Sequence, residues 1–257
     1  MIYNESFKIQ QSFEDNIKWV KQLKTGFREN LFQAYFQPIV DTKTKEVYKY
    51  EALMRYITKE GVEIAPYHFI NVAKKTKLYP NIIKIVIQDS FKLIKNKNKR
   101  VSVNISFDDI ANEETTAFIY EILEQNKDLT QFLEFEILES EEISDFNEVS
   151  RFISEIKKFD CIVGVDDFGA GYSNFNLLTL LDIDFVKIDG SLIEKINSSK
   201  DLEIIVNTIA NFSKEFKVKT VAEYVSNEDI YNKIKELNID YCQGYYFDRP
   251  LCYDCIK

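Results

Sequence analysis

Eight strand-like segments, most of them separated by helical patterns, constrain the fold of this chain more than any other feature. Each segment is short and rich in Val, Ile, Phe or Tyr, as buried strands are. The segments are residues 36–40, 49–56, 100–106, 133–138, 161–166, 185–189, 217–223 and 241–246. Helical patterns between them include residues 81–95, 140–159 and 191–216. Strands that alternate with helices predict a mostly parallel sheet, and eight of them predict a closed (β/α)8 barrel.

The connection between the first two strands departs from this pattern. Only residues 41–46 and little more join them, whereas a parallel crossover needs a dozen or more residues. We therefore expect an α/β fold, a modified TIM (β/α)8 barrel whose first strand runs antiparallel. The barrel is expected to occupy residues 32–257 as a single domain, a length within the range of such barrels.

Residues 1–31 are expected to form an N-terminal helical segment. Ser12 and Asp15 resemble a capping box. Apolar residues then recur at helical spacings, at Phe13, Ile17, Val20, Phe27 and Leu31. Two interpretations stay open: the helix packs on its own domain, or it is the end of a connector from an upstream domain.

Charge and composition exclude several classes of function. The formal net charge is −9, so the chain is a poor general binder of DNA or RNA duplexes, whose affinity depends on clustered Lys and Arg. No apolar run is long enough for a membrane span, and no signal peptide is evident, so we expect a cytoplasmic location without membrane contact. A single histidine, His68, argues against a histidine-rich metal site.

Polar residues collect near the C-terminal ends of the predicted strands, where barrels of this type carry their active sites. They are Glu51, Asn104, Glu136, Asp166, Asp167, Lys187, Asp189, Glu223 and Gln243. Carboxylates that converge inside a barrel are costly unless cations neutralise them. Oxygen ligands of this kind suit Mg²⁺, Mn²⁺ or Ca²⁺ rather than zinc.

An ordered set of motifs runs from about Phe36 to Leu251. One is Glu51-Ala52-Leu53, followed by Arg55. The others are residues 36–40, 103–106, 136–140, 166–173, 186–189, 221–223, 243–245 and 249–251. Together they resemble the EAL domain of cyclic di-GMP phosphodiesterases, in which Glu51-Ala52-Leu53 is the namesake motif. The sequence departs from the commonest family pattern at Leu138, Ala170, Tyr224 and Ser226.

The resemblance implies a role for each of these positions. Glu51, Asn104, Glu136 and Asp166 would hold one metal ion, and Asp166, Asp167 and Glu223 a second. Lys187 would position or activate the attacking water, with Glu223 and Asp189 also in the catalytic set. The ligand would be contacted by Gln37, Leu53, Arg55 and Gln243. Glu139 would support the loop at residues 166–171.

The resemblance also implies an activity. The expected reaction is metal-dependent hydrolysis of cyclic di-GMP to linear 5′-pGpG with two Mg²⁺ or Mn²⁺ ions, whereas Ca²⁺ should bind but support little turnover. The alternative is a receptor that binds cyclic di-GMP without hydrolysing it and signals to a partner. Retention of all metal positions and of Lys187 favours catalysis.

The resemblance further implies partners. An upstream sensor or GGDEF domain is one, and a homodimer that forms near the loop at residues 166–172 is another. The apolar segment at residues 173–181 favours a partner surface. The alternative is that Leu177, Leu178, Leu180 and Leu181 pack on the barrel.

Overall fold

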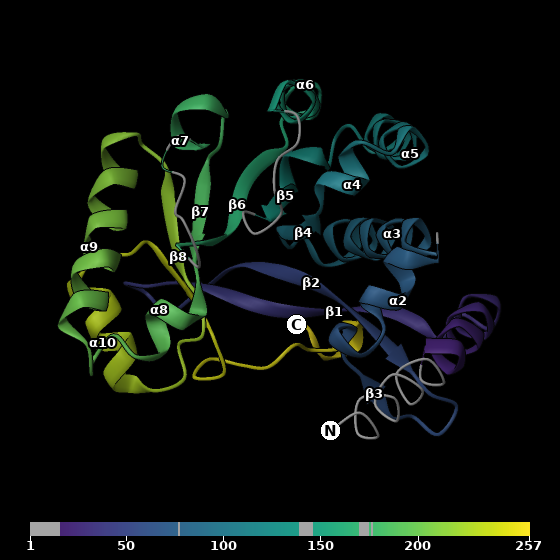
Figure 1. The fold of residues 1–257 in the computed structure, drawn as a ribbon, viewed down its shortest axis with the longest axis horizontal. Coiled ribbons are helices and arrows are strands. Elements are labelled where there is room, and N and C mark those ends of the chain that lie inside the picture. Colours follow the sequence, from purple (N-terminus) through teal and green to yellow (C-terminus); the bar gives the residue numbers. More distant parts are fainter. Residues whose placement is uncertain (1–15, 77, 139–145, 170–174, 176) are drawn as a thin grey trace, which may run out of the picture.

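The computed structural model describes residues 16–76, 78–138, 146–169, 175 and 177–257 (Figure 1). One sheet contains all of the strands in this part of the chain. They are β1 Phe32–Asp41, β2 Val47–Ile57, β3 Glu63–Ile64, β4 Val101–Ile105, β5 Leu133–Leu138, β6 Ile162–Phe168, β7 Phe185–Ile188, β8 Lys219–Ala222 and β9 Tyr241–Gln243. Their order is β1-β9-β8-β7-β6-β5-β4-β2-β3, and an additional β1–β2 pairing closes the sheet into a barrel.

The direction of β1 confirms the predicted irregularity. β1 is antiparallel to β2 on one side and to β9 on the other, whereas the neighbouring pairs from β2–β4 through β8–β9 are parallel. The β1–β2 connection is a tight turn in which Asp41 accepts hydrogen bonds from the backbone of Lys43 and Thr44. The two-residue strand β3, which was not predicted, pairs with the far end of β2.

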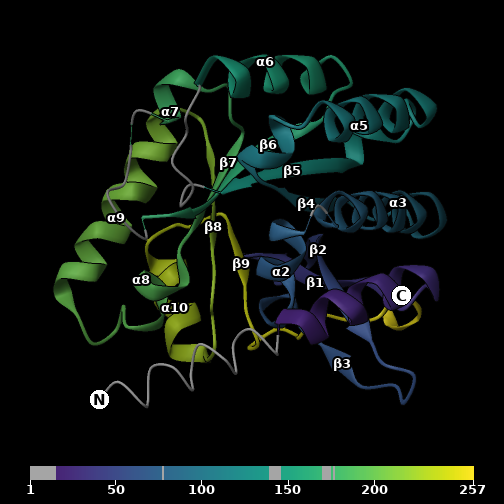
Figure 2. The same cartoon turned by 45° about the vertical axis from the view of Figure 1, so that its right-hand side comes forward.

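Helices surround the barrel in both views (Figures 1 and 2). They are α2 Ile70–Lys75, α3 Tyr79–Lys97, α4 Phe107–Ile110, α5 Glu113–Gln125, α6 Phe146–Lys157, α7 Leu177–Leu180, α8 Gly190–Glu194, α9 Lys200–Glu215 and α10 Glu228–Glu236. The prediction for residues 81–95 is confirmed by α3. For residues 140–159 the described part, α6, is helical.

The helical pattern at residues 191–216 corresponds to two separate helices, α8 and α9. The side chain of Ser199 accepts a hydrogen bond from the backbone of Leu202 and thereby caps α9. Asp201 and Glu203 in the first turn favour a helix start at this point, since acidic groups stabilise helix N-termini. Residues 197–201, around this break, are all polar.

Side chains alternate between two layers, as the pleat of each strand requires. Val163, Val165 and Phe135 point outward into the main core beneath the helices. A smaller inner layer, formed by Ile39, Phe185 and Val221 with Ile162 and Tyr241, fills the barrel interior. Polar inward positions lie farther along the same strands, so the inner layer forms a floor beneath them.

The helix at residues 16–28 packs on the β1–β2 hairpin. Leu23 is fully buried in the main core, and the Trp19 ring contacts the ring of Tyr56 with a centroid distance of 6.2 Å. At Gly26 an added Cβ would lie 2.6 Å from the Phe32 ring, so glycine permits the helix to approach the hairpin closely. Ser12, Phe13 and Asp15, on which the helix start was predicted, lie outside the described residues. No helix in the described part of the chain has the length and apolar character needed to cross a bilayer.

Candidate metal centre

The polar residues predicted at the strand ends converge at one end of the barrel. Glu51, Asn104, Glu136, Asp166, Lys187 and Gln243 project inward from β2, β4, β5, β6, β7 and β9, and Glu223 directly follows β8. The parallel register places Asn104 beside Glu136 and Leu138 beside Asp166. Because the C-terminal ends of parallel strands share one rim, residues far apart in sequence meet there.

Lys187 is the centre of this group and is 1% exposed. Its ammonium nitrogen lies 2.7 Å from Glu223 Oε1, 2.9 Å from Asp166 Oδ1, 3.0 Å from Glu136 Oε2 and 3.3 Å from Glu51 Oε2. One cation therefore faces four carboxylates. This excess of negative charge is the condition in which a buried acidic site attracts further cations.

Two side-chain amides hold the Glu51 carboxylate in place. Asn104 Nδ2 donates to Glu51 Oε1 and Gln243 Nε2 donates to Glu51 Oε2, each at 2.7 Å. Gln243 Nε2 also lies 3.3 Å from Gln37 Oε1. Within the described part of the chain, the buried oxygens Asn104 Oδ1 and Gln243 Oε1 have no hydrogen-bond donor. Buried oxygens without a donor are suited to a cation, so the residues fit a metal ion.

Two groups of carboxylates offer oxygens close enough together to bind one ion each. Glu51, Glu136 and Asp166 form the first group, and Asp166, Asp167 and Glu223 form the second, with the ligand atoms of each group within 4.8 Å of one another. The groups share Asp166. They coincide with the carboxylates that the family resemblance assigns to two metal ions, and their role as ligands remains a prediction.

The electrostatics of the site oppose full ionisation of these carboxylates. Burial, together with the nearby Glu51 carboxylate, raises the pKa of Glu223 to about 7 against the opposing effect of Lys187. Burial also raises the pKa of Asp166 well above its usual value. Burial would raise the pKa of Glu136 too, but Lys187 and Lys49 more than offset it and the pKa is lowered. Burial alone would lower the pKa of Lys187, yet the four carboxylates raise it well above its usual value.

The loop that follows β6 begins with an unusual backbone. Asp167 has a φ of 56°, in the left-handed region that Asp tolerates better than most residues. Its backbone N–H donates to Asp166 Oδ1 at 3.0 Å, which fixes the shared carboxylate. Burial, followed by the carboxylate of Asp189, raises the pKa of Asp167. Residues 170–172 of this loop lie outside the described residues, and so does Glu139, which was predicted to support the loop.

Asp189 has a different local structure from the one predicted. It follows β7 rather than lying in it, and its carboxylate caps α8 by accepting hydrogen bonds from the backbone and side chain of Ser191. The helix start ends the strand at Ile188. The Asp189 carboxylate lies close enough to Asp167 to raise the pKa of that group.

The predicted ligand-contacting residues of β2 lie farther along the strand than Glu51. Leu53 and Arg55 share its face and are half-buried. The Arg55 guanidinium donates to the Met54 backbone oxygen at 2.8 Å and lies 5.8 Å from the centre of the Tyr35 ring. No ion pair joins Arg55 to a carboxylate of the described residues, so its charge is available at the mouth of the barrel.

Tyr224 shows the structural effect of one departure from the family pattern. It has a φ of 53°, a left-handed conformation that glycine adopts readily and tyrosine rarely. Its ring packs over Gly190, where an added Cβ would lie 2.2 Å from the ring. The Tyr224 side chain is 68% exposed and follows Glu223 directly. An aromatic surface therefore borders the acidic site.

The prediction missed Lys49 and Glu134, which lie directly beneath the acidic group. Both are 1% exposed, and Lys49 Nζ lies 2.6 Å from Glu134 Oε2. Each precedes a predicted site residue by two positions, Lys49 before Glu51 and Glu134 before Glu136. Strand alternation alone would have placed both side chains inside the barrel.

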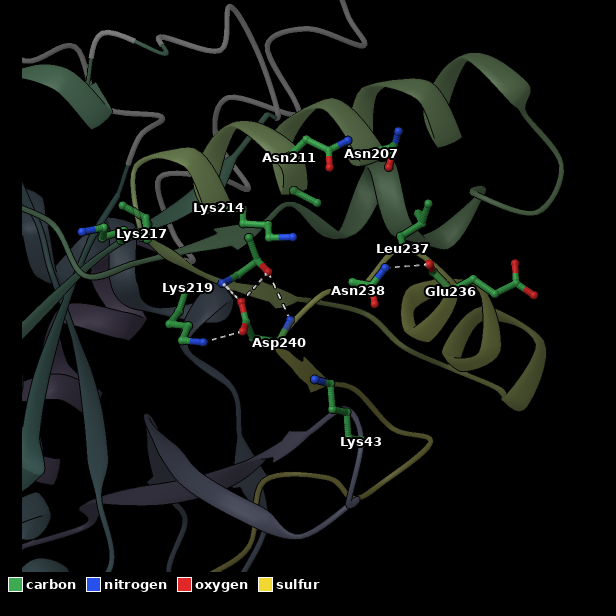
Figure 3. A pocket seen from close by; sticks show the side chains of 13 residues that line it. Lys43, Asn207, Asn211, Lys214, Lys217, Lys219, Glu236, Leu237, Asn238 and Asp240 are labelled. Atoms are coloured by element: carbon green, nitrogen blue, oxygen red, sulfur yellow. Dashed lines mark hydrogen bonds and ion pairs between the residues drawn. The ribbon is translucent and has the colours of Figure 1, made fainter.

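A cavity of about 520 Å³ lies at the opposite end of the barrel (Figure 3). Its lining includes Lys43, Lys214, Lys217 and the Lys219–Asp240 ion pair, which measures 2.7 Å. Lys214 belongs to the last turn of α9 and Lys217 follows it, where ammonium groups balance the negative end of the helix dipole. This balance accounts for Lys214 and Lys217, Lys219 is paired with Asp240, and we place the functional site at the acidic group.

The fold and the site define a TIM-barrel-like protein with a buried carboxylate cluster at the C-terminal rim of its parallel strands. The EAL domain family matches residues 20–250 of the chain, and the chain belongs to this family.

Two curated relatives show similarity across nearly the whole chain. Cyclic di-GMP phosphodiesterase PdeA of Borreliella burgdorferi is 28% identical over 254 residues, which cover 97% of this chain and 38% of that protein. Cyclic di-GMP phosphodiesterase PdeF of Escherichia coli is 28% identical, with 94% of this chain and 33% of that protein covered. The chain thus spans about a third of the length of these relatives.

Solved structures support the fold. An EAL domain protein from Listeria monocytogenes superposes with a TM-score of 0.82 at 29% identity, covering 90% of this chain and 93% of that chain. PaMucR phosphodiesterase, solved as a c-di-GMP complex, superposes with a TM-score of 0.83 at 23% identity, covering 91% of this chain and 97% of that chain. At that identity the second likeness shows the fold alone.

Proposed function

We propose that this chain is a metal-dependent phosphodiesterase that hydrolyses cyclic di-GMP to linear 5′-pGpG. The observation that carries the proposal is the pair of carboxylate groups that share Asp166 and surround Lys187. The names of the relatives supply the substrate class. The retained lysine and carboxylates favour catalysis over a receptor that only binds the nucleotide.

The rim residues form two sets, each of which would hold one cation. Glu51, Asn104, Glu136 and Asp166 would hold one ion, and Asp166, Asp167 and Glu223 the other. Two divalent ions that share a ligand lower the pKa of a water molecule and neutralise charge on the phosphate. Mg²⁺ and Mn²⁺ suit this oxygen-rich set, whereas the larger Ca²⁺ would bind with looser geometry and support little turnover.

The other side chains position the water and the ligand. Lys187 is rigidly held by its four carboxylates and would donate a hydrogen bond to the attacking oxygen and orient it. Asp189, beside Asp167, would accept a proton or hydrogen bond from the same water network. Arg55 would pair with a ligand phosphate, and Gln37, Leu53 and Gln243 would border the bound nucleotide.

Product analysis tests the proposal. Purified protein is incubated with cyclic di-GMP in Mn²⁺, Mg²⁺, Ca²⁺ or EDTA, and the nucleotides are resolved by ion-exchange chromatography. We expect pGpG in Mn²⁺ and Mg²⁺, little in Ca²⁺ and none in EDTA. Asp166→Asn, which changes the shared carboxylate, should lower turnover by about 10²-fold or more. Full activity after exhaustive chelation would refute the metal mechanism, and tight nucleotide binding without product in Mn²⁺ and Mg²⁺ would identify a receptor.

A further inference from the structure

Lys49 is a buried lysine that the proposed chemistry does not use. It projects from β2 into the barrel and is 1% exposed. Its ammonium nitrogen lies 2.6 Å from Glu134 Oε2, 3.4 Å from Glu136 Oε1 and 3.5 Å from the centre of the Phe185 ring. An ammonium group that has lost its water needs such partners, since burial without them is strongly unfavourable.

The floor of the barrel is shaped to admit this lysine. At Gly164 an added Cβ would lie 2.3 Å from the Phe185 ring, so glycine leaves the space that the ring occupies. The ring then presents its face to Lys49, an arrangement that attracts cations. Glu134, the nearer carboxylate, is also paired with Arg100 at 3.3 Å. A chain of alternating charges therefore runs from Arg100 at the N-terminal rim to Glu136 in the acidic site.

Glu136 is where this chain of charges meets the candidate metal centre. Its carboxylate is completely buried, and its two oxygens face different partners. Oε1 is directed to Lys49, whereas Oε2 lies 3.0 Å from Lys187, on the side of the other site carboxylates. Because Lys49 holds Oε1 from below, the Glu136 carboxylate cannot rotate freely. Oε2 is then the oxygen that faces the candidate metal centre.

We propose that Lys49 is a positioning residue that orients Glu136 so that this carboxylate can help to hold the first metal ion. The inference rests on the proposed function, since it concerns the affinity of the same site for a divalent cation. Partners that orient a metal ligand from behind commonly change metal affinity by about 10–100-fold when removed. Glu134 and Arg100 serve to hold Lys49 and compensate its charge.

The test uses a pair of changes that keeps the net charge of the protein. Lys49→Met/Glu134→Leu removes one positive and one negative group and refills the space with apolar atoms. Such replacements of buried ion pairs are often neutral for stability, so the metal-free variant should unfold within about 5 °C of the wild type. Calorimetric titration of EDTA-treated protein with Mn²⁺, without nucleotide, should show a Kd raised by about 10–100-fold.

Three further variants separate positioning from general electrostatics. Glu134→Gln keeps Lys49 and leaves a side-chain oxygen that can accept its hydrogen bond, so Glu136 should stay held and the wild-type affinity for Mn²⁺ should be retained. Lys157→Met removes ion pairs with Asp182 at 3.0 Å and Asp184 at 3.1 Å, outside the barrel, and should leave Mn²⁺ binding unchanged. Lys49→Met alone, measured in parallel, should weaken Mn²⁺ binding like the double variant.

The outcomes distinguish this inference from the proposed function. Wild-type Mn²⁺ affinity in either folded Lys49 variant would overturn the positioning role, and so would an equal loss in Glu134→Gln. A wild-type protein that binds no Mn²⁺ would instead refute the proposed function itself. Hydrolysis that recovers at saturating Mn²⁺ in the double variant would support a role in metal affinity.

Discussion

Lys187 stabilises the metal-free site and has a proposed role in catalysis, and Lys187→Ala tests both roles. In the metal-free protein it is the cation nearest to four carboxylates, and removing one partner of a buried ion pair costs about 3–5 kcal/mol. We expect Lys187→Ala to lower the thermal stability of the metal-free protein, with Mn²⁺ restoring most of it. Turnover should fall by roughly 10²-fold or more while cyclic di-GMP binding persists.

Lys219→Ala is a matched control for this prediction. Its ion pair with Asp240 lies at the opposite end of the barrel, so turnover should not change. Differential scanning calorimetry, equilibrium binding and product analysis provide the three measurements. Unchanged turnover in Lys187→Ala would show that the lysine has only a structural role.

The raised pKa of Glu223 predicts how metal affinity depends on pH. Cations bind the deprotonated carboxylate, and the pKa of about 7 in the metal-free protein means that protons compete below that pH. Mn²⁺ should therefore bind at least about tenfold more weakly at pH 6 than at pH 8. Calorimetry in buffers of different ionisation enthalpy would count the protons released. A pH-independent Mn²⁺ affinity between these values would contradict the prediction, whereas Glu223→Gln should reduce the dependence.

Most of the acidic rim could be predicted from the sequence because strand alternation places every second residue inside a barrel. Glu51 and Glu136 are examples, each flanked by outward apolar neighbours. Lys49 and Glu134 obey the same alternation but were not recognised. Burial of either charge is favourable only when the other one is paired with it, and the two residues lie on different strands. Pairing between distant residues is fixed by register, which one sequence does not reveal.

At the scale of elements, the helix at residues 16–28 can be tested for its attachment to the barrel. Leu23 is fully buried, so Leu23→Ala should lower the free energy of unfolding by about 2–5 kcal/mol. Trp19 is the only tryptophan and lies in this helix, so its fluorescence reports the helix while far-UV circular dichroism reports the whole fold. Both signals should change at the same urea concentration. Separate transitions would indicate a detachable connector, and Lys24→Ala, an exposed neighbour, should have little effect.

Element boundaries were predictable where turn chemistry was strong. The short, polar β1–β2 connection identified the antiparallel strand, because chain length alone forbids a crossover. The break between α8 and α9 lies in the polar run at residues 197–201, which contains the Ser199 cap. Asp189 was placed at the end of a strand because its capping role depends on a helix start that periodicity does not mark.

At the scale of the whole molecule, the predicted homodimer concerns the surface around α7. Leu177, Leu178 and Leu181 are buried against the barrel, as the alternative interpretation expected, whereas Leu180 is 58% exposed. We predict a two-fold dimer in solution in which Leu180 is covered, since self-complementary interfaces are the commonest kind. Light scattering should give twice the monomer mass for the wild type and the monomer mass for Leu180→Glu. A wild-type monomer at micromolar concentration would leave the dimer without support.

The antiparallel pairing of β1 with β9 also has a consequence for biosynthesis. Gln243 lies 206 residues after its partner Gln37 and 192 residues after Glu51. At about 5–20 residues per second, translation needs roughly 10–40 s to pass from Gln37 to Gln243. During that interval the edge of β1 that faces β9 has no strand to pair with, and unpaired edges invite association with other chains. The nascent barrel is therefore most vulnerable just before β9 is made, when the acidic rim still lacks one of the two amides that hold Glu51.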